Sequence, residues 1–157
     1  MNITHFTLAE FVESDKAKAQ GIDNTLPEDL EPAAWATLAL LEKIRAELSR
    51  QAGRDVPIKI NSGYRCPALN AAVGSKPGSD HLKAAAADIL APAFGSPLKV
   101  AQALAPLVSV LGIGQLIYER PRGKANAWVH VSTRMPAKAV NRIITITEHD
   151  YLPGVVA

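Results

Sequence analysis

Two histidines and an aspartate, His81, Asp88 and His130, have side chains that bind metal ions in proteins. Two imidazoles and a carboxylate are a ligand set of catalytic zinc, which keeps a fourth position open. His81 and Asp88 are seven positions apart; one helix would separate them by about 10 Å, and one strand would place them on opposite faces. Both reach one ion only if the chain bends between them, which the small residues 84–87 permit. By itself, this spacing is more typical of structural or solvated residues.

The elements that must position this cluster can also be predicted from the sequence. The first part of the chain has the signals of helices. Thr7 and Glu10 have the spacing of a capping box, which predicts a first helix that ends at Gly21. A second helix is predicted over residues 27–50 or 32–50, because apolar residues recur there every three or four positions. They are Leu30, Ala34, Leu38, Leu41, Ile44 and Leu48.

The second half of the chain has mainly strand signals. Before them, Ser96 as N-cap, Pro97 and Gly112 predict a third helix, which Pro106 should kink or shorten. Strands are predicted at residues 56–60, 115–119, 128–132 and 143–147. Helices that precede strands indicate an α+β fold, with N-terminal helices packed on a small antiparallel sheet that carries the metal site. A length of 157 residues predicts one domain over residues 1–157.

The strands at 115–119 and 128–132 are joined by a polar loop and predict a hairpin. If Glu119 lies opposite Trp128, then Ile117 lies opposite His130, and Glu119 shares a face with His130. A slip of one residue would turn Glu119 away and bring Tyr118 to the metal side.

Three segments resemble the zinc D-alanyl-D-alanine carboxypeptidase family of peptidases: SGYRCPALNAAVG, SDHLKAAAAD and WVHVS. The family's central motif reads S-x-H-x-x-G-x-A-x-D, and a second histidine follows in a late strand. Ser79, His81, Ala86 and Asp88 match this motif, whereas Ala84 replaces its glycine. The first residues of the chain, HFTLAEFVESDKAKAQGIDNTLP, are also similar to phage and prophage members.

The resemblance implies that His81, Asp88 and His130 bind zinc. It also implies that Arg65, in SGYR, binds a substrate carboxylate or carbonyl, and we expect it to take no part in metal binding or folding. A guanidinium suits that role, because it is always charged and makes two-pronged contacts with anions. The alternative is that Arg65 is a surface arginine in a turn.

The general base is the residue for which the chain departs from the family. Many relatives carry a glutamate three residues before the last histidine, where this chain has Ala127. Glu119 is our candidate, because the expected register places it beside His130 and because some phage relatives have a QLI-x-E strand there, similar to QLIYE. The alternative is that Glu119 is an exposed carboxylate on an edge strand.

The resemblance implies a zinc metallopeptidase that cleaves stem or cross-link peptides of peptidoglycan, as a D,D-carboxypeptidase or endopeptidase similar to phage endolysins. Zinc would polarise the scissile carbonyl and activate water, and Glu119 would transfer the proton to the leaving amine. Because position 127 lacks a glutamate, a non-catalytic binding or virion-structural module of the same fold remains the alternative. Turnover of a cell-wall substrate would separate the two.

Composition limits the remaining functions. A net charge of +2 gives no reason to expect a nucleic-acid partner, and no apolar run is long enough for a membrane span. The single cysteine, Cys66, excludes an intramolecular disulfide and a CxxC motif. The N-terminus has no signal-peptide pattern. We therefore expect a monomer or virion-associated protein, made in the bacterial cytoplasm before it reaches the wall. His5 and His149 are expected at the surface.

Overall fold

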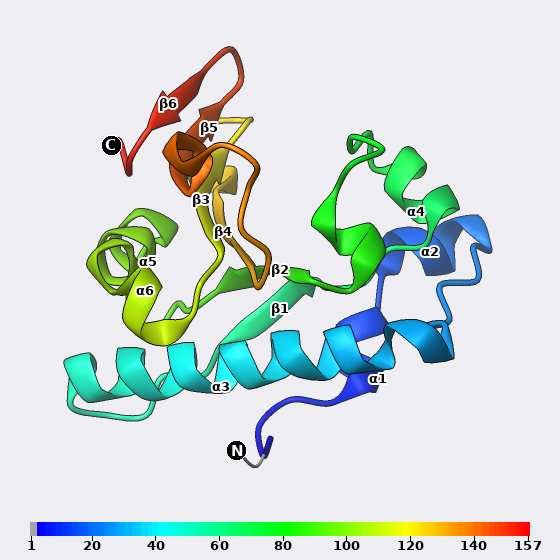
Figure 1. The fold of residues 1–157 in the computed structure, drawn as a ribbon, viewed down its shortest axis with the longest axis horizontal. Helices are drawn as coiled ribbons and strands as arrows, with labels where there is room; N and C mark the ends of the chain where they lie inside the picture. The colour runs from blue at the N-terminus through cyan, green and yellow to red at the C-terminus, as the bar shows by residue number, and fades with distance from the viewer. Residues whose placement is uncertain (1–2) are drawn as a thin grey trace.

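The computed structural model describes residues 3–157, apart from the side chain of Lys124. One sheet of six strands has the order β1-β2-β4-β3-β5-β6, with helices packed on one side and around its first strands (Figure 1). In that order the strands are β1 (Lys59–Ser62), β2 (Ala86–Leu90), β4 (Trp128–Ser132), β3 (Gln115–Arg120), β5 (Ile143–Thr147) and β6 (Tyr151–Pro153). The helices are α1 (Leu8–Val12), α2 (Asp15–Gln20), α3 (Glu31–Ala52), α4 (Pro67–Ala72), α5 (Pro97–Leu104) and α6 (Val108–Leu111). The expected α+β class is confirmed.

The first predicted helix is divided into two. Thr7 Oγ1 accepts a hydrogen bond from Glu10 N at 3.2 Å, as the capping box predicts. The helix nevertheless stops after one turn, because Glu13 adopts an extended conformation. Ser14 then caps α2, which ends at Gly21 in the left-handed conformation. A second capping residue inside a predicted helix, here Ser14, thus marks the point where one helix ends and the next begins.

Helix α3 provides the main apolar face, as its periodicity predicts. Leu38, Leu41, Ile44 and Leu48 are fully buried, and the helix runs beneath β1 and β2 (Figure 1). The third predicted helix begins with Ser96 as its N-cap but is interrupted at Pro106, where the turn Ala105–Leu107 separates α5 from α6. Among the described residues, no helix combines the length and apolar character that a membrane crossing requires.

The predicted hairpin has the expected register: Glu119 lies opposite Trp128 and Ile117 lies opposite His130. The expectation of an antiparallel sheet is wrong for one pair, because β5 runs parallel to β3. Strand β1 starts at Lys59 and not at residue 56, in keeping with the inability of Pro57 to donate a hydrogen bond in a sheet.

Strand β2, which the sequence pattern does not predict, pairs with both β1 and β4. It is buried on both faces and contains a run of alanines, so it lacks the alternation by which half-buried strands are recognised. Asp88 on β2 lies directly opposite His130 on β4. The sheet itself therefore brings two of the expected ligands together.

Candidate metal centre

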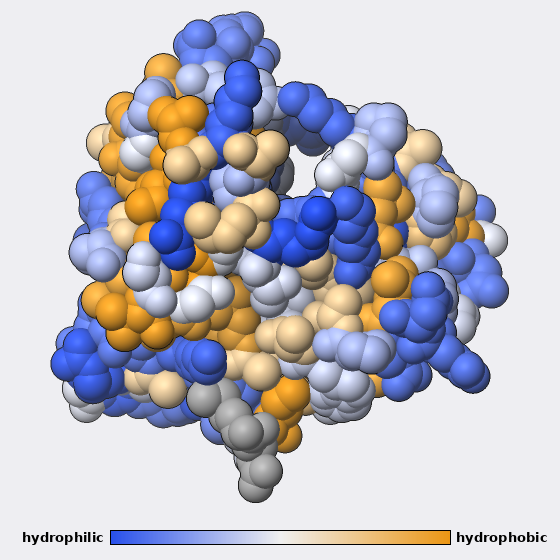
Figure 2. All heavy atoms as spheres, viewed as in Figure 1, coloured by the Kyte–Doolittle hydropathy of each residue, from blue (hydrophilic) through white to orange (hydrophobic). Residues whose placement is uncertain are grey.

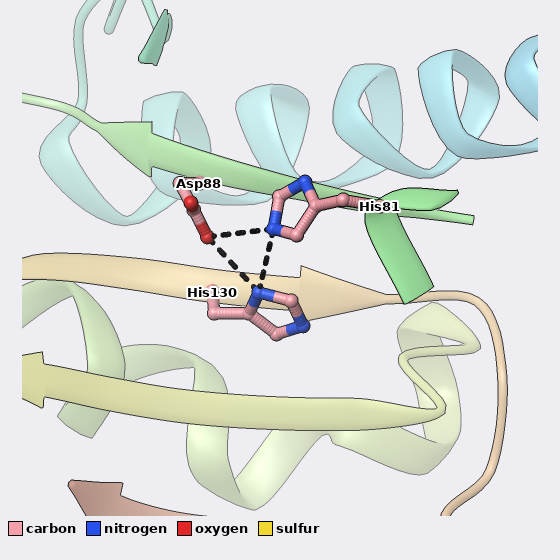
Figure 3. A group of neighbouring side chains, drawn as sticks. All are labelled: His81, Asp88 and His130. Atoms are coloured by element: carbon pink, nitrogen blue, oxygen red, sulfur yellow. Dashed lines mark hydrogen bonds and ion pairs between the residues drawn. The ribbon is translucent and has the colours of Figure 1, made fainter. Parts of the chain in front are cut away.

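His81, Asp88 and His130 converge on one point (Figure 3). His81 comes from η2 (Asp80–Lys83), a 3-10 turn that precedes β2. Its Nε2 is 3.2 Å from Asp88 Oδ1 and 3.2 Å from His130 Nδ1, and the latter two atoms are 2.9 Å apart. All three residues are buried. The structure therefore brings together the three residues expected as ligands.

The spacing of these three atoms fits a zinc ion. The three donor atoms lie 2.9–3.2 Å from one another, a separation that bonds of about 2.0–2.1 Å to one zinc ion permit. His81 Nδ1 donates a hydrogen bond to the Gly63 carbonyl at 2.6 Å, so Nε2 presents a lone pair to the centre. That lone pair faces the Asp88 oxygen, which can only accept a hydrogen bond, so the two atoms cannot hydrogen-bond to each other. A cation between them would bind both atoms.

The carbonyl that orients His81 requires a glycine at position 63. A side chain there would begin 2.2 Å from the backbone oxygen of Phe11, whose carbonyl also accepts a hydrogen bond from Tyr64 N at 2.9 Å. The N-terminal helix α1 thus packs directly against the SGYR segment. The glycine of this segment is a positioning residue that ligand spacing alone did not reveal.

The expected bend between His81 and Asp88 is present and is centred on Ala84. This alanine has a φ of 52° and lies in the left-handed region, which favours glycine. Its N–H donates to the His81 carbonyl at 3.2 Å, and Ala85 N donates to the Asp80 carbonyl at 3.0 Å. The backbone conformation explains why the family motif has glycine at this position.

The carboxylate of Asp80 ties η2 to the end of β4. It accepts hydrogen bonds from Ser132 Oγ at 2.8 Å and from Arg134 Nη1 at 2.6 Å. Ser132 is fully buried and lies two residues after His130. These contacts hold the turn that carries His81 against the strand that carries His130.

Burial and mutual contact set the ionisation of the cluster. Burial lowers the pKa of His81 and so favours the neutral form that a metal requires. Burial alone would raise the pKa of Asp88, but the His81 and His130 imidazoles hold it well below its usual range. The cluster therefore contains an ionised carboxylate at neutral pH.

Glu119 is beside the cluster, on the same face of the sheet. Its Oε1 is 3.9 Å from His130 Nδ1. Burial, followed by the negative charge of Asp88, raises the pKa of Glu119 to about 7. Tyr118 belongs to the buried core of the molecule, and Glu148 is exposed. The one-residue slip that would exchange Glu119 for Tyr118 does not occur.

Arg65 contacts Asp88, one of the three expected ligands, which differs from our expectation that it is independent of the metal site. Its Nη2 donates to Asp88 Oδ2 at 2.6 Å and its Nε donates to Ser62 Oγ at 2.8 Å. The side chains of Arg65 and Asp88 are only 11% and 9% exposed. Sequence reasoning missed this pair because nothing local to SGYR indicates that β1 lies beside β2.

The other two histidines are away from the cluster. His5 pairs with Glu42 on α3 at 2.8 Å, through Nδ1 and Oε2. His149 lies in the turn between β5 and β6 and has an 81% exposed side chain. Neither belongs to the group that could hold a metal.

A family model described as Peptidase M15 matches residues 4–132 of the chain. The match covers most of the sequence and contains His81, Asp88 and His130, so the chain belongs to the peptidase M15 family. No curated protein matches the chain. Membership indicates a metallopeptidase, in agreement with the buried His-Asp-His group.

Proposed function

We propose that residues 1–157 form one catalytic domain of a zinc-dependent peptidase that hydrolyses stem or cross-link peptides of peptidoglycan. The observation that carries this proposal is the position of the Glu119 carboxylate, 3.9 Å from His130 in the buried His-Asp-His cluster. A carboxylate in this place supplies the proton-transfer group that Ala127 lacks. It therefore favours an enzyme over a non-catalytic module.

Zinc bound by His81, Asp88 and His130 would supply Lewis-acid polarisation of the scissile carbonyl and activation of water. Glu119 accepts a proton from the attacking water and returns it to the leaving amine. Burial raises the pKa of Glu119 above its ordinary value in the metal-free protein, which makes this carboxylate a stronger base than an exposed one.

Arg65 has two functions in this proposal. Through Nη2 and Nε it orients the Asp88 carboxylate from β1. Its other terminal amine, Nη1, makes no hydrogen bond to a described residue, and we assign to it the substrate's carboxylate or acyl oxygen. An arginine can serve both purposes because its donors point in several fixed directions.

Digestion of purified peptidoglycan, with mass analysis of the fragments, tests the proposal. The zinc-loaded protein is expected to release peptide fragments, and a chelator is expected to stop the reaction until zinc is returned. Glu119→Gln serves as a matched control, because it keeps the shape of the side chain without the ability to accept a proton. Zinc-loaded protein that releases no fragment from intact or pre-digested wall would refute the proposal.

We further propose that the protein acts as a phage or prophage lysis enzyme, or as part of a virion, and that it reaches the wall from the host cytoplasm. The phage-like first residues support this role. Expression in bacteria should cause lysis only when a membrane-permeabilising agent is added. Lysis without that agent, or none with it, would contradict this route.

A further inference from the structure

Two segments far apart in the sequence meet through a contact between side chains. Lys76 Nζ lies 4.7 Å from the ring centroid of Tyr151. Lys76 belongs to the loop between α4 and η2, and Tyr151 is the first residue of β6. In Figure 1 this loop and the β5–β6 hairpin rise on opposite sides, with β2 and β4 between them. Figure 2 shows an opening between the two sides that is closed above by polar atoms.

The two sides of this opening carry the residues of the site. The loop with Lys76 leads directly into η2, which holds His81. On the other side, Tyr151 pairs with Ile146, and Ile146 pairs with Glu119. Paired residues share a face of the sheet, so Tyr151 lies in the same row and on the same face as Glu119. The Lys76–Tyr151 contact therefore joins the segment that precedes His81 to the face of the sheet that carries Glu119.

Buried hydrogen bonds hold the position of Lys76. Asn70, which is only 3% exposed, donates from Nδ2 to the Lys76 carbonyl at 3.0 Å. Ser79 N donates to the same carbonyl at 3.1 Å, at the entry to η2. The loop is thus tied both to α4 and to the turn that carries His81. Such anchoring indicates a defined conformation with a fixed point of contact.

The β5–β6 hairpin is held in a similar way. Thr145 is fully buried, and its hydroxyl donates to the Gly154 carbonyl at 2.9 Å. Tyr151 nevertheless remains an exposed aromatic residue. It also lies beyond the matched family region, which ends at residue 132. Tyr151 therefore lies outside the region that the family model matches, whereas Lys76 lies within it.

We propose that Lys76 and Tyr151 form a bridge over the active site and thereby determine specificity. A peptide with a free end enters lengthwise beneath the bridge, whereas a cross-link between two glycan strands is bulky on both sides and must wait until the bridge opens. The protein accordingly prefers linear, uncross-linked stem peptides. This inference rests on the proposed peptidase function and narrows its substrate.

The bridge limits entry without sealing the site, because both partners are exposed. A cation–π contact between exposed groups shifts an open–closed equilibrium by about two- to fivefold. Removal of either partner should therefore change the preference between substrates by about that factor. Hydrolysis of a small linear peptide should change little.

The test compares initial rates on a soluble linear stem pentapeptide and on a soluble cross-linked muropeptide dimer, both with zinc-loaded protein. Lys76→Ala and Tyr151→Ala should each raise the cross-linked to linear rate ratio by about two- to fivefold. Tyr151→Phe keeps an aromatic ring and should leave the ratio unchanged. Lys16→Ala, which removes an exposed lysine on α2, should also leave it unchanged.

Hydrogen exchange provides a second readout that does not depend on catalysis. Tyr151→Ala should speed exchange of the backbone amides in residues 74–79 as well as in residues 148–151, because the two segments support each other. An unchanged rate ratio, or an unaltered exchange rate in 74–79, would overturn the bridge. Failure of the wild-type protein to cleave either peptide would instead overturn the proposed function, and the substrate preference with it.

Discussion

Replacement of Arg65 by methionine tests whether the arginine supports Asp88, one of the three proposed zinc ligands. The substitution keeps an unbranched side chain but removes the hydrogen bonds to Asp88 Oδ2 and Ser62 Oγ. A lost hydrogen bond to a charged group costs about 1.5–3 kcal/mol, and the low exposure of Asp88 places this case toward the upper end. We expect a loss of about 2–3 kcal/mol, or roughly 4–12 °C in Tm for a domain of this size.

Zinc affinity should fall in the same variant. Partners that orient a metal ligand typically account for a factor of about 10–100 in affinity. Titration against a chromophoric chelator measures this factor, and thermal unfolding of the metal-free protein measures the stability. The two experiments separate the effect on folding from the effect on the metal.

Arg45→Met provides a matched control. Arg45 is 13% exposed, close to the value for Arg65, but its partner Asp55 is 65% exposed. Breaking such a pair costs about 0–1 kcal/mol, because water replaces the lost contact. If Arg65→Met and Arg45→Met have equal melting temperatures and equal zinc affinities, the contact with Asp88 has no energetic role and our reasoning is wrong.

Four further outcomes follow from the site. Arg65→Lys keeps the positive charge but loses the planar guanidinium, and it should lower kcat/KM tenfold or more, about 1.4 kcal/mol; unchanged efficiency would show that Arg65 does not contact the substrate. His81→Ala and His130→Ala should lose zinc in elemental analysis, whereas His5→Ala and His149→Ala should keep it. Glu119→Gln should bind zinc and substrate normally but turn over about a hundredfold more slowly; full activity would place the base elsewhere. Burial, then the neighbouring Asp88, raises the pKa of Glu119 from 4.5 to about 7, so in metal-free protein the folded state retains a proton that the unfolded chain releases. Glu119 should therefore contribute a fall in stability between pH 4.5 and 7 of about 3 kcal/mol at most, measured in denaturant titrations as the difference in slope between the wild-type protein and Glu119→Gln.

Short-range patterns in the sequence determined much of this fold. The caps at Thr7 and Ser96 and the apolar periodicity of α3 predict helices because their causes lie within a few residues. The register of the β3–β4 hairpin also follows from local information, since the side-chain period of two leaves few pairings that place Glu119 beside His130.

Only the tertiary structure decided how distant segments meet. Strand β2 was not recognisable from its alanines, and the parallel pairing of β5 with β3 depends on the path of the connection between them. The contacts of Arg65 with Asp88 and of Gly63 with His81 follow from β1 lying beside β2 and from η2 packing against SGYR. Periodicity reports which face of an element is buried, but it carries no information on which neighbour covers that face. For this reason the sequence predicts the candidate ligands, while the groups that orient them become visible only once the sheet is assembled.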